Sequence, residues 1–305
     1  MLSIIIIDYD SIETTVDYIR HFIDMSDKST QLHFIVVDNY INSNAEKFLK
    51  KQFQKYTIEG CELGRVLIIE HMDAKIVYHY TGENLGFAKG NNRGFRIQKI
   101  LFNDPIVIFS NSDIKLLKPF NTKEFNQLFL HYPDVAVIGP EVIRIDGIKQ
   151  NPHKKVSAWN RLIRYYWQML IPFIKVSGDY DYSESNKICY WVSGCFMIVS
   201  ANKFDDVQGF DEGTFLYGEE MILAERLAKR GYKELFVKDY SIIHETGGTV
   251  KRFKSKETSE KICFDSLCYY FSKYRSASKI IIWIARINFI VCKYLLRAKY
   301  KIYKK

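Results

Sequence analysis

Short apolar runs alternate with longer segments of helical periodicity through the first half of the chain, and this alternation restricts the fold more than any other feature. Five runs have the length and composition of buried strands: Ser3–Ile7, His33–Val37, Lys75–Tyr80, Ile106–Phe109 and Val135–Ile138. Three segments between them carry apolar residues at helical spacing: Ile12–Met25, Ala45–Tyr56 and Phe87–Leu101. Such alternation indicates βαβ units, so we predict an α/β fold with a mostly parallel central sheet flanked by helices.

Polar side chains follow several of these predicted strands at the point where each strand ends. Asp8 follows the first strand, Asp38 and Asn39 follow the second, and Asn111 and Asp113 follow the fourth. In open α/β sheets the ligand crevice lies beyond the carboxyl ends of the strands. We therefore expect a site at this edge, although any one of these residues could instead cap the next helix.

The second half of the chain is less regular. We predict an aromatic helix over Trp159–Phe173, a strand over Ile188–Ser200 and a helix over Gly218–Arg230. Gly231 follows the last helix, where a glycine C-cap is common. Neither an internal repeat nor a low-complexity linker divides the chain, so we expect one continuous sheet.

The basic charge is concentrated at the C-terminus. The formal net charge is +9, and Ser266–Lys305 contains ten Lys or Arg residues and no Asp or Glu. The remainder of the chain is therefore nearly neutral. This distribution argues against nucleic-acid binding by the folded body and favours contact between the tail and an anionic membrane surface.

Residues 279–305 contain no Pro or Gly and read as an amphipathic helix, part of a helical basic extension over 251–305. Arg286 and Lys293 interrupt its apolar run, so we expect a helix that lies in a membrane interface rather than one that spans it. The alternative is a helix docked on the protein core with its basic stripe in water. The stripe consists of Lys279, Arg286, Lys293, Arg297, Lys301 and Lys304.

The cysteines and the N-terminus indicate a cytoplasmic location. Six cysteines are present and no pair has C-x-x-C spacing, which indicates free thiols in a reducing compartment and no zinc site. No cationic stretch and no long apolar run precede Asp8, so the sequence predicts no signal peptide.

Four segments carry motifs whose order and spacing resemble one enzyme family. They are Ser3–Asp10 with Val36–Asn39; Asn84–Gly94; Ser110–Ile114; and Trp191–Gly194 followed by Gly209–Glu212, Phe215–Glu220, Arg226 and Gly231. Together they resemble the family 2 inverting glycosyltransferases, in particular the rhamnosyltransferase-like branch that builds bacterial surface polysaccharides. The resemblance implies a GT-A fold, the Rossmann-like fold of nucleotide-diphospho-sugar transferases, over residues 1–250.

The resemblance implies that residues 1–115 form the half that binds the nucleotide sugar. Asp38 would accept a hydrogen bond from the base, with helix capping as the alternative. The glycine-rich loop Asn84–Gly94 would lie at the nucleotide, with an ordinary strand-to-helix turn as the alternative. The residues expected at the donor nucleotide are Asp8, Tyr9, Asp38, Asn84, Gly86, Asn92, Asn111 and Ser112.

The segment from Asn111 to Asp113 occupies the place of the family's D-x-D metal motif, with Asn at the first position. Asp113 is the expected ligand of Mn²⁺ or Mg²⁺, because hard cations prefer oxygen ligands and bridge substrate phosphates. His244, after the predicted strand Tyr240–Ile243, resembles the later histidine of this branch, which meets the metal or the diphosphate. A structural histidine is the alternative.

Glu219 and Glu220 stand where the family has Glu-Asp, whose second acid is the general base of an inverting displacement. We therefore predict Glu220 as the base, with Glu219 as support or substitute, and we expect Glu220 and Asp113 to converge on one donor sugar. Two departures weaken the match: Glu replaces Asp, and Ile222 stands where the branch usually has a second Asp. The alternative is an acidic helix N-terminus, which the helix dipole favours.

Residues 116–250 would form the acceptor-side half. Trp191 and Gly194 would face the acceptor there, as would Asp211 and Glu212, although Trp191 could instead fill the core and the two acids could cap a helix.

The expected activity is that of a metal-dependent hexosyl or deoxyhexosyl transferase. It would move a sugar from a dTDP-, UDP- or GDP-linked donor to a hydroxyl of a lipid-linked or growing saccharide in capsule or lipopolysaccharide synthesis. The enzyme would be peripheral on the inner face of the bacterial cytoplasmic membrane. A non-catalytic nucleotide-sugar or glycan-binding subunit is the alternative, whereas the missing G-x-G-x-x-G fingerprint disfavours a dinucleotide-binding enzyme.

Overall fold

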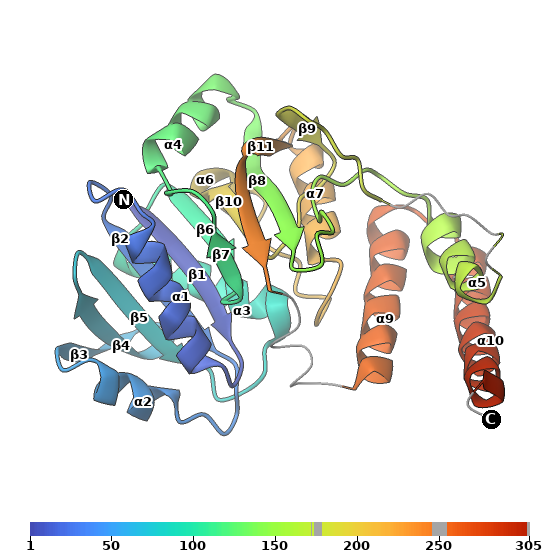
Figure 1. Ribbon diagram of the computed structural model, residues 1–305, viewed down its shortest axis with the longest axis horizontal. Coiled ribbons are helices and arrows are strands. Elements are labelled where there is room, and N and C mark those ends of the chain that lie inside the picture. Colours follow the sequence, from blue (N-terminus) through green and yellow to red (C-terminus); the bar gives the residue numbers. More distant parts are fainter. Residues whose placement is uncertain (172, 174–178, 246–254, 304–305) are drawn as a thin grey trace.

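An eleven-stranded sheet runs through the body of the protein in the computed structural model, which describes residues 1–171, 173, 179–245 and 255–303 (Figure 1). The strands are β1 (Leu2–Asp8), β2 (Leu32–Asp38), β3 (Tyr56–Cys61), β4 (Gly64–His71), β5 (Ala74–Tyr80), β6 (Ile106–Ser110), β7 (Ile114–Leu116), β8 (Val135–Arg144), β9 (Lys187–Cys189), β10 (Phe196–Ser200) and β11 (Lys233–His244). Their order is β3-β4-β5-β2-β1-β6-β10-β8-β11-β7, and β9 pairs with β11 outside this path.

The strands nearest the N-terminus form the parallel part of the sheet. Strands β5, β2, β1 and β6 are mutually parallel neighbours, as the βαβ pattern predicted. All seven residues of β2 are buried, which fits a parallel strand covered on both faces. Strand β10 then runs antiparallel to both β6 and β8, and β8 pairs in parallel with β11. The sheet is therefore mixed, with its parallel section at the predicted strands.

Two predicted elements differ from the observed ones. The helix expected over Ala45–Tyr56 ends at Gln52, and the chain then forms the antiparallel hairpin β3–β4 on the edge of the sheet. The strand expected over Ile188–Ser200 is divided into β9 and β10. Between them, the backbone N–H of Val192 donates to Glu234 and that of Gly194 donates to Glu220. Buried carboxylates thus take the place of a neighbouring strand.

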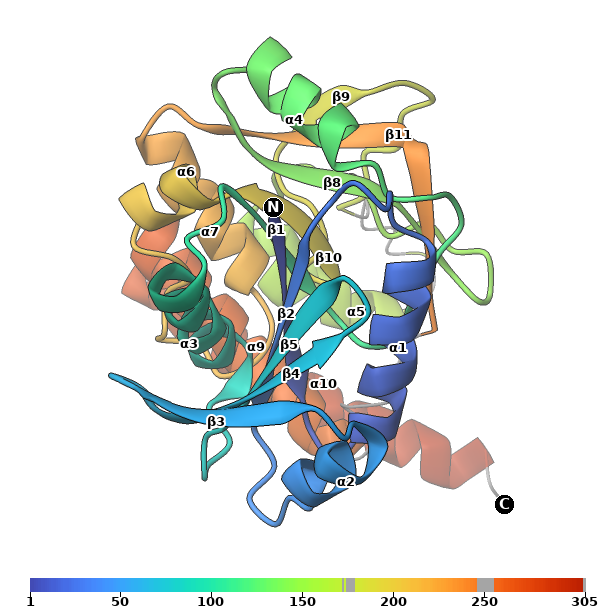
Figure 2. The same cartoon turned by 90° about the vertical axis from the view of Figure 1, so that its left-hand side faces the viewer.

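Helices cover both faces of the sheet because successive side chains of a strand point to opposite faces. Ile4 and Ile6 of β1 pack with α1 (Ile12–Asp24), α2 (Ala45–Gln52) and α4 (Thr122–His131), whereas Ile5 packs with α3 (Gly86–Leu101), α6 (Ala201–Asp206) and α7 (Glu219–Lys229). Figure 2 shows α1 on one side of the strands and α3 and α7 on the other.

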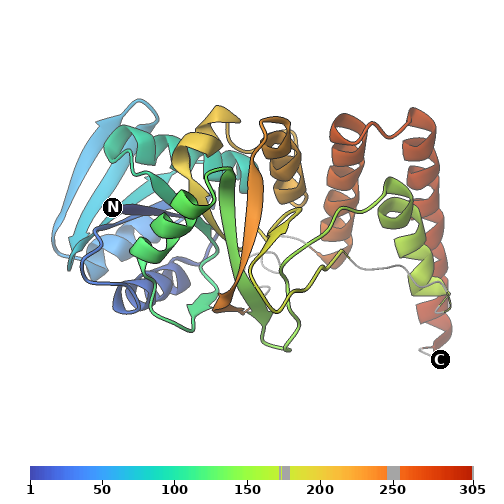
Figure 3. The same cartoon turned by 90° about the horizontal axis from the view of Figure 1, so that it is seen from above.

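Besides the apolar cores on the two faces of the sheet, a third core joins the body to four helices. We call these helices the helical unit: η1 (Trp159–Arg164), α5 (Tyr165–Leu170), α9 (Lys256–Tyr274) and α10 (Lys279–Tyr303). Figure 3 shows α9 between the body and α10, with α5 beside α10. Met221 and Ile222 of α7 are buried in this core, and the rings of Phe264 and Phe289 stack there with centroids 4.2 Å apart. Packing against the helical unit therefore explains the apolar residue at position 222.

The basic stripe of α10 contacts the protein in part. Arg286 lies 3.1 Å from Asp265 of α9, while Lys293 and Arg297 both pair with Glu257. The side chains of Lys301 and Lys304, and the predicted boundary between residues 250 and 251, lie outside the part of the chain that the structure describes. Within the described residues, no helix combines the length and the apolar composition that crossing a bilayer requires.

The segment that carries Gly194 packs tightly on β8. A Cβ atom at Gly139 would lie 2.5 Å from Cβ of the fully buried Val192, closer than carbon atoms approach. We predict that Gly139→Ala lowers the free energy of unfolding by about 1–3 kcal/mol through overpacking. Urea denaturation followed by circular dichroism measures this change. Gly60→Ala on β3, where a Cβ would meet nothing within 4 Å, is the control, and equal stability of the two variants would contradict the packing described.

Candidate active site

A cavity of about 360 Å³ lies at the carboxyl ends of β1 and β6, and we call it the donor cavity. Segments far apart in the sequence line it: the ends of β1, β2 and β11, the starts of α3 and α7, the loop after β6 and the segment before β10. Ten predicted site residues line it: Tyr9, Asn84, Gly86, Asn111, Ser112, Asp113, Gly194, Glu219, Glu220 and His244. Asp113 and Glu220, which we expected to converge on one donor sugar, therefore line the same cavity.

The start of α3 and the segment before α7 meet at Gly86. This residue has φ +73°, and a Cβ on it would lie 2.3 Å from the carbonyl oxygen of Phe215. The same carbonyl accepts a hydrogen bond from the N–H of Phe87, and the side chain of Asn84 accepts one from the N–H of Gly86. Only glycine combines this backbone conformation with so close an approach, which brings the two halves of the cavity together.

Asn39 is a cavity residue that our site prediction missed. Its Nδ2 donates to the carbonyl of Gly86 at 3.0 Å, which fixes the amide. Its Oδ1 is buried and has no hydrogen-bond partner among the described residues. A buried acceptor of this kind is costly unless a ligand satisfies it. The sequence feature that could have identified Asn39 is its position directly after strand β2.

Asp113 and His244 form the candidate metal centre. Asp113 Oδ1 lies 3.4 Å from His244 Nε2, and Asn111 Nδ2 lies 3.4 Å from the same nitrogen. On the other side of the ring, Nδ1 is 2.8 Å from Gln150 Oε1. A ring that donates from Nδ1 to Gln150 keeps Nε2 directed at Asp113, which is the usual way in which an outer partner orients a ligating histidine.

The donor set fits a hard divalent cation that takes its remaining ligands from a substrate. Within the described residues, no cluster of three or more His, Cys, Asp or Glu side chains could enclose a metal by itself. Mg²⁺ and similar ions are commonly held by one or two protein ligands together with phosphate oxygens and water. Although burial opposes the charged form, the hydrogen bond with Asp113 raises the pKa of His244 to about 10. Without a cation, the two side chains therefore form an ion pair.

The two acids at the start of α7 are placed differently. Glu220 Oε1 accepts a hydrogen bond of 3.1 Å from the N–H of Gly194, and a Cβ on Gly194 would lie 2.5 Å from that oxygen. Glu219 is 2% exposed, and its Oε1 has no hydrogen-bond partner among the described residues. Burial raises the pKa of Glu220, while burial and the charge of Glu220 raise the pKa of Glu219.

A second cavity, of about 420 Å³, adjoins the first at Glu220, Ser193 and Gln150, which line both. Its other walls include Asn160 and Arg161 of the helical unit. We call it the joint cavity, because the body and the helical unit both contribute to it.

The predicted acceptor residue Trp191 lines the joint cavity, so it does not lie wholly within the core. One face of its ring is covered, since the ring stacks on His153 with centroids 3.5 Å apart. Its Nε1 lacks a hydrogen-bond partner among the described residues. Trp191 therefore lines the joint cavity with a ring that is covered on one face and whose N–H is buried.

Two predicted donor residues do not line either cavity. The carboxylate of Asp8 accepts hydrogen bonds from Ser11 and Thr15, so it stabilises the start of α1. The carboxylate of Asp38 is fully buried and accepts the hydroxyl of Tyr78 at 2.6 Å. Internal hydrogen bonds engage both side chains, and the residue after Asp38 reaches the cavity instead.

Three further predicted residues lie in a separate groove. The amide of Asn92 bonds both the N–H and the carbonyl of Phe210, and it also donates to Glu212, so it joins α3 to the segment before α7. Asp211 accepts hydrogen bonds from Lys273 and other α9 side chains. Asn92, Asp211 and Glu212 thus connect structural elements, and the structure does not bring them to the donor or acceptor positions that we predicted.

Comparison with known proteins places these features in a family. No protein-family model matches the chain. Rhamnosyltransferase WbbL of Escherichia coli K12 is 35% identical over 239 residues, which cover 71% of this chain and 85% of that protein. N-acetylglucosaminyl-diphospho-decaprenol L-rhamnosyltransferase, from two strains of Mycobacterium tuberculosis, is 24% identical over 184 residues. That match covers 56% of this chain and 59% of the mycobacterial proteins, so the chain spans less than two thirds of their length.

The fold has counterparts among solved structures. The crystal structure of GalNAc-T7 with UDP, GalNAc and Mn²⁺ superposes with a TM-score of 0.54 and 10% sequence identity, covering 81% of this chain and 44% of that chain. At this identity the likeness concerns the fold alone, and it agrees with the GT-A fold predicted from the motifs. The identity to WbbL and the extent of that match, together with this fold, establish that the chain belongs to the GT-A glycosyltransferase family.

Proposed function

We propose that the protein is an inverting glycosyltransferase that moves a sugar from a nucleotide-diphospho-sugar to a hydroxyl of a saccharide acceptor. The observation that carries this proposal is the position of Glu220. Its side chain lines the donor cavity, which also holds Asp113 and His244, and it lines the joint cavity as well. A base at the junction of two cavities can meet an acceptor from one side and a donor from the other.

The donor would bind with its diphosphate at Asp113 and His244. These two residues would hold Mn²⁺ or Mg²⁺, which when bound neutralises the charge that develops on the departing nucleoside diphosphate. The nucleoside would lie toward Tyr9, Asn84 and Asn39, whose buried Oδ1 can accept a hydrogen bond from the base or the ribose. A dTDP-, UDP- or GDP-linked sugar has these groups, and the cavity lining does not favour one of the three.

Glu220 would act as the general base. Its carboxylate takes the proton of the acceptor hydroxyl while that oxygen forms a bond to the anomeric carbon, and the bond from this carbon to the diphosphate breaks on the opposite face. Attack opposite to the leaving group inverts the anomeric configuration. The N–H of Gly194 holds Oε1 and so orients the carboxylate, and the raised pKa of Glu220 makes it a stronger base than an exposed glutamate.

The joint cavity would take the acceptor. Trp191, Asn160 and Arg161 give it hydrogen-bond donors suited to hydroxyl groups or to an acidic group. The names of the relatives, which include a diphospho-decaprenol substrate, support a lipid-linked saccharide acceptor and a role in bacterial surface polysaccharide synthesis, such as capsule or lipopolysaccharide. The enzyme would then work as a peripheral protein on the inner face of the cytoplasmic membrane, within the rhamnosyltransferase-like branch of family 2.

The rival function is a non-catalytic subunit that binds nucleotide sugars or glycans. Its support in the sequence is that Glu at position 220 and Ile at position 222 replace the Asp residues usual in the family. Ile222, however, is fully buried against the helical unit, so packing accounts for that departure. Glu220 keeps a carboxylate at the junction of the cavities, and we therefore favour the enzyme.

We predict that Glu220→Gln lowers kcat by about 10²–10⁴-fold while the affinity for the donor stays within about twofold, because the amide cannot accept the acceptor proton. Transfer assays and calorimetry measure the two effects, with Glu62→Gln on the exposed β3–β4 turn as control. In the wild type, kcat falls as the pH decreases through a pKa above the usual glutamate value, since protonation removes the base. A Glu220→Gln enzyme with normal turnover would exclude this mechanism.

We predict that Asp113→Asn and chelation by EDTA each abolish transfer, because the diphosphate then lacks its cation. Calorimetry provides a second readout: Mn²⁺ should strengthen binding of a nucleoside diphosphate to the wild type and to the exposed control Asp73→Asn, but not to Asp113→Asn. Full activity in chelator would remove the metal from the proposal.

We predict that Glu219→Gln stabilises the fold in alkaline solution. The pKa of Glu219 is higher in the folded state than in the unfolded state. The neutral acid therefore contributes its full stability below the unfolded pKa. This contribution is lost as the pH rises through the folded pKa. Glutamine stays neutral, so the melting temperature should exceed that of the wild type by about 2 °C or more near pH 9 and match it near pH 4. Differential scanning calorimetry tests this, and a lower melting temperature near pH 9 would show that the ionised acid is stabilising.

A further inference from the structure

Helix α10 has two apolar faces, and the protein covers only one of them. Ala285, Phe289 and Cys292 are buried in the third core. On another face, Trp283 is 63% exposed, Ile290 is 67% exposed and other large apolar side chains line the same side. These side chains recur at helical spacing over four turns: Ile280, Trp283, Ile287, Ile290 and Tyr294. A stripe of this length on a protein surface marks an interaction site.

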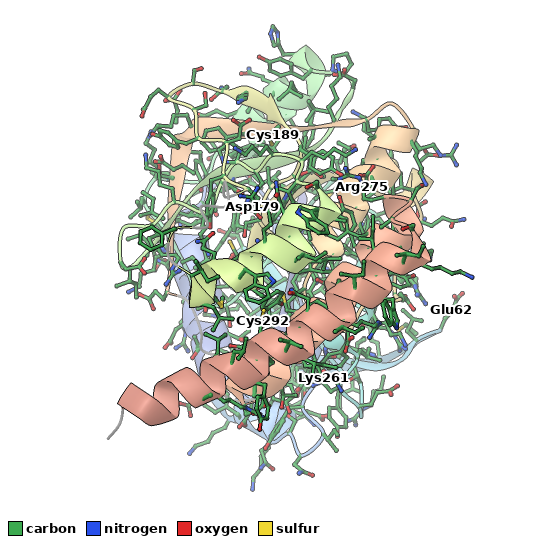
Figure 4. All side chains as sticks on the ribbon, turned by 90° about the vertical axis from the view of Figure 1, so that its right-hand side faces the viewer. Glu62, Asp179, Cys189, Lys261, Arg275 and Cys292 are labelled. Atoms are coloured by element: carbon green, nitrogen blue, oxygen red, sulfur yellow. The ribbon has the colours of Figure 1, made fainter. Side chains whose placement is uncertain are left out.

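The neighbouring short helices also carry exposed apolar side chains. Trp159 at the start of η1 and Met169 near the end of α5 are both exposed, and Phe173, just beyond α5, is 93% exposed. Figure 4 looks onto this end of the molecule, where α10 crosses the front with α5 beside it. We call the exposed apolar side chains of α10, η1 and α5, together with Phe173, the outer face.

The excess basic charge of the helical unit indicates which kind of partner the outer face would bind. Its four helices contain eleven Lys or Arg residues and three Asp or Glu residues. A second copy of this chain would place one strongly basic surface against another, which disfavours self-association. A bilayer that contains anionic lipids offers an apolar interior to the outer face and negative head groups to the excess basic charge of the helical unit.

Two of the helices that contribute to the outer face also line the joint cavity. Asn160, Arg161 and Tyr165 of η1 and α5 line that cavity, which reaches Glu220. Residues from the same two short helices therefore form part of the outer face and part of a wall of the joint cavity. A lipid-linked molecule could then keep its lipid in the bilayer while its saccharide extends along these helices.

We propose that the outer face lies in the boundary between head groups and acyl chains of an anionic membrane, and that it holds the mouth of the joint cavity at the membrane surface. The acceptor part of this inference rests on the proposed function. Binding depends mainly on insertion of apolar side chains, because Arg286, Lys293 and Arg297 already pair with acids of α9.

Vesicle flotation with the full chain tests the membrane part. The triple variant Trp283→Ser, Ile287→Glu and Ile290→Glu should reduce binding to vesicles of phosphatidylcholine and phosphatidylglycerol by about tenfold or more, and wild-type binding should persist in high salt. The matched control is Leu130→Glu on α4, an 81% exposed apolar residue at the other end of the molecule, which should bind as the wild type does. Circular dichroism checks that all variants are folded.

Transfer assays separate this inference from the proposed function. The triple variant should keep wild-type activity on an acceptor with a short, water-soluble lipid and lose activity on an acceptor embedded in vesicles. If the wild type binds vesicles but transfers no sugar to either acceptor, the proposed function fails while the membrane surface stands. Equal vesicle binding by wild type and triple variant overturns the inference. So does a wild-type dimer, detected by analytical ultracentrifugation, that the triple substitution dissociates.

Discussion

The hydrogen bond from the N–H of Gly194 to the carboxylate of Glu220 fixes the position of that carboxylate, and the rest of the site depends on this position. It joins the segment before β10 to the first turn of α7, and a Cβ on Gly194 would lie only 2.5 Å from the carboxylate oxygen. The partners of this contact are held from two directions. Val192 packs against Gly139 of the sheet, and Ile222 is buried against the helical unit. The body and the helical unit thus jointly place one carboxylate between two cavities.

The donor cavity holds two pairs of polar groups. Asp113 and His244 form one pair, with atoms suited to a cation and a diphosphate. Glu219 and Glu220 form the other, and burial raises the pKa of both. The proposed base and the proposed site for the leaving group therefore line the same cavity, as the proposed displacement requires.

The parts of the fold that follow from local patterning were predictable, and those that depend on tertiary contacts were not. The parallel strands and their helices have clear periodicity, whereas β3 is an edge strand that is exposed along most of its length and has no run of buried apolar residues to mark it. Motif order pointed to Asp113 and Glu220, which line one cavity. Asp38 was assigned to the nucleotide because of the family resemblance, but Tyr78 from the neighbouring strand engages its carboxylate, and sequence spacing does not reveal such a contact. Asn39, one residue later, reaches the cavity instead.

In the proposed function, one donor molecule contacts Asp113, His244 and Glu220 within the donor cavity. A crystal structure of the protein with Mn²⁺ and a non-transferable nucleotide-diphospho-sugar tests it most directly. The account predicts the diphosphate at Asp113 and His244, with the anomeric carbon facing Glu220 from the side opposite to the diphosphate. A sugar that lies in the joint cavity, or a diphosphate bound away from Asp113, would contradict it.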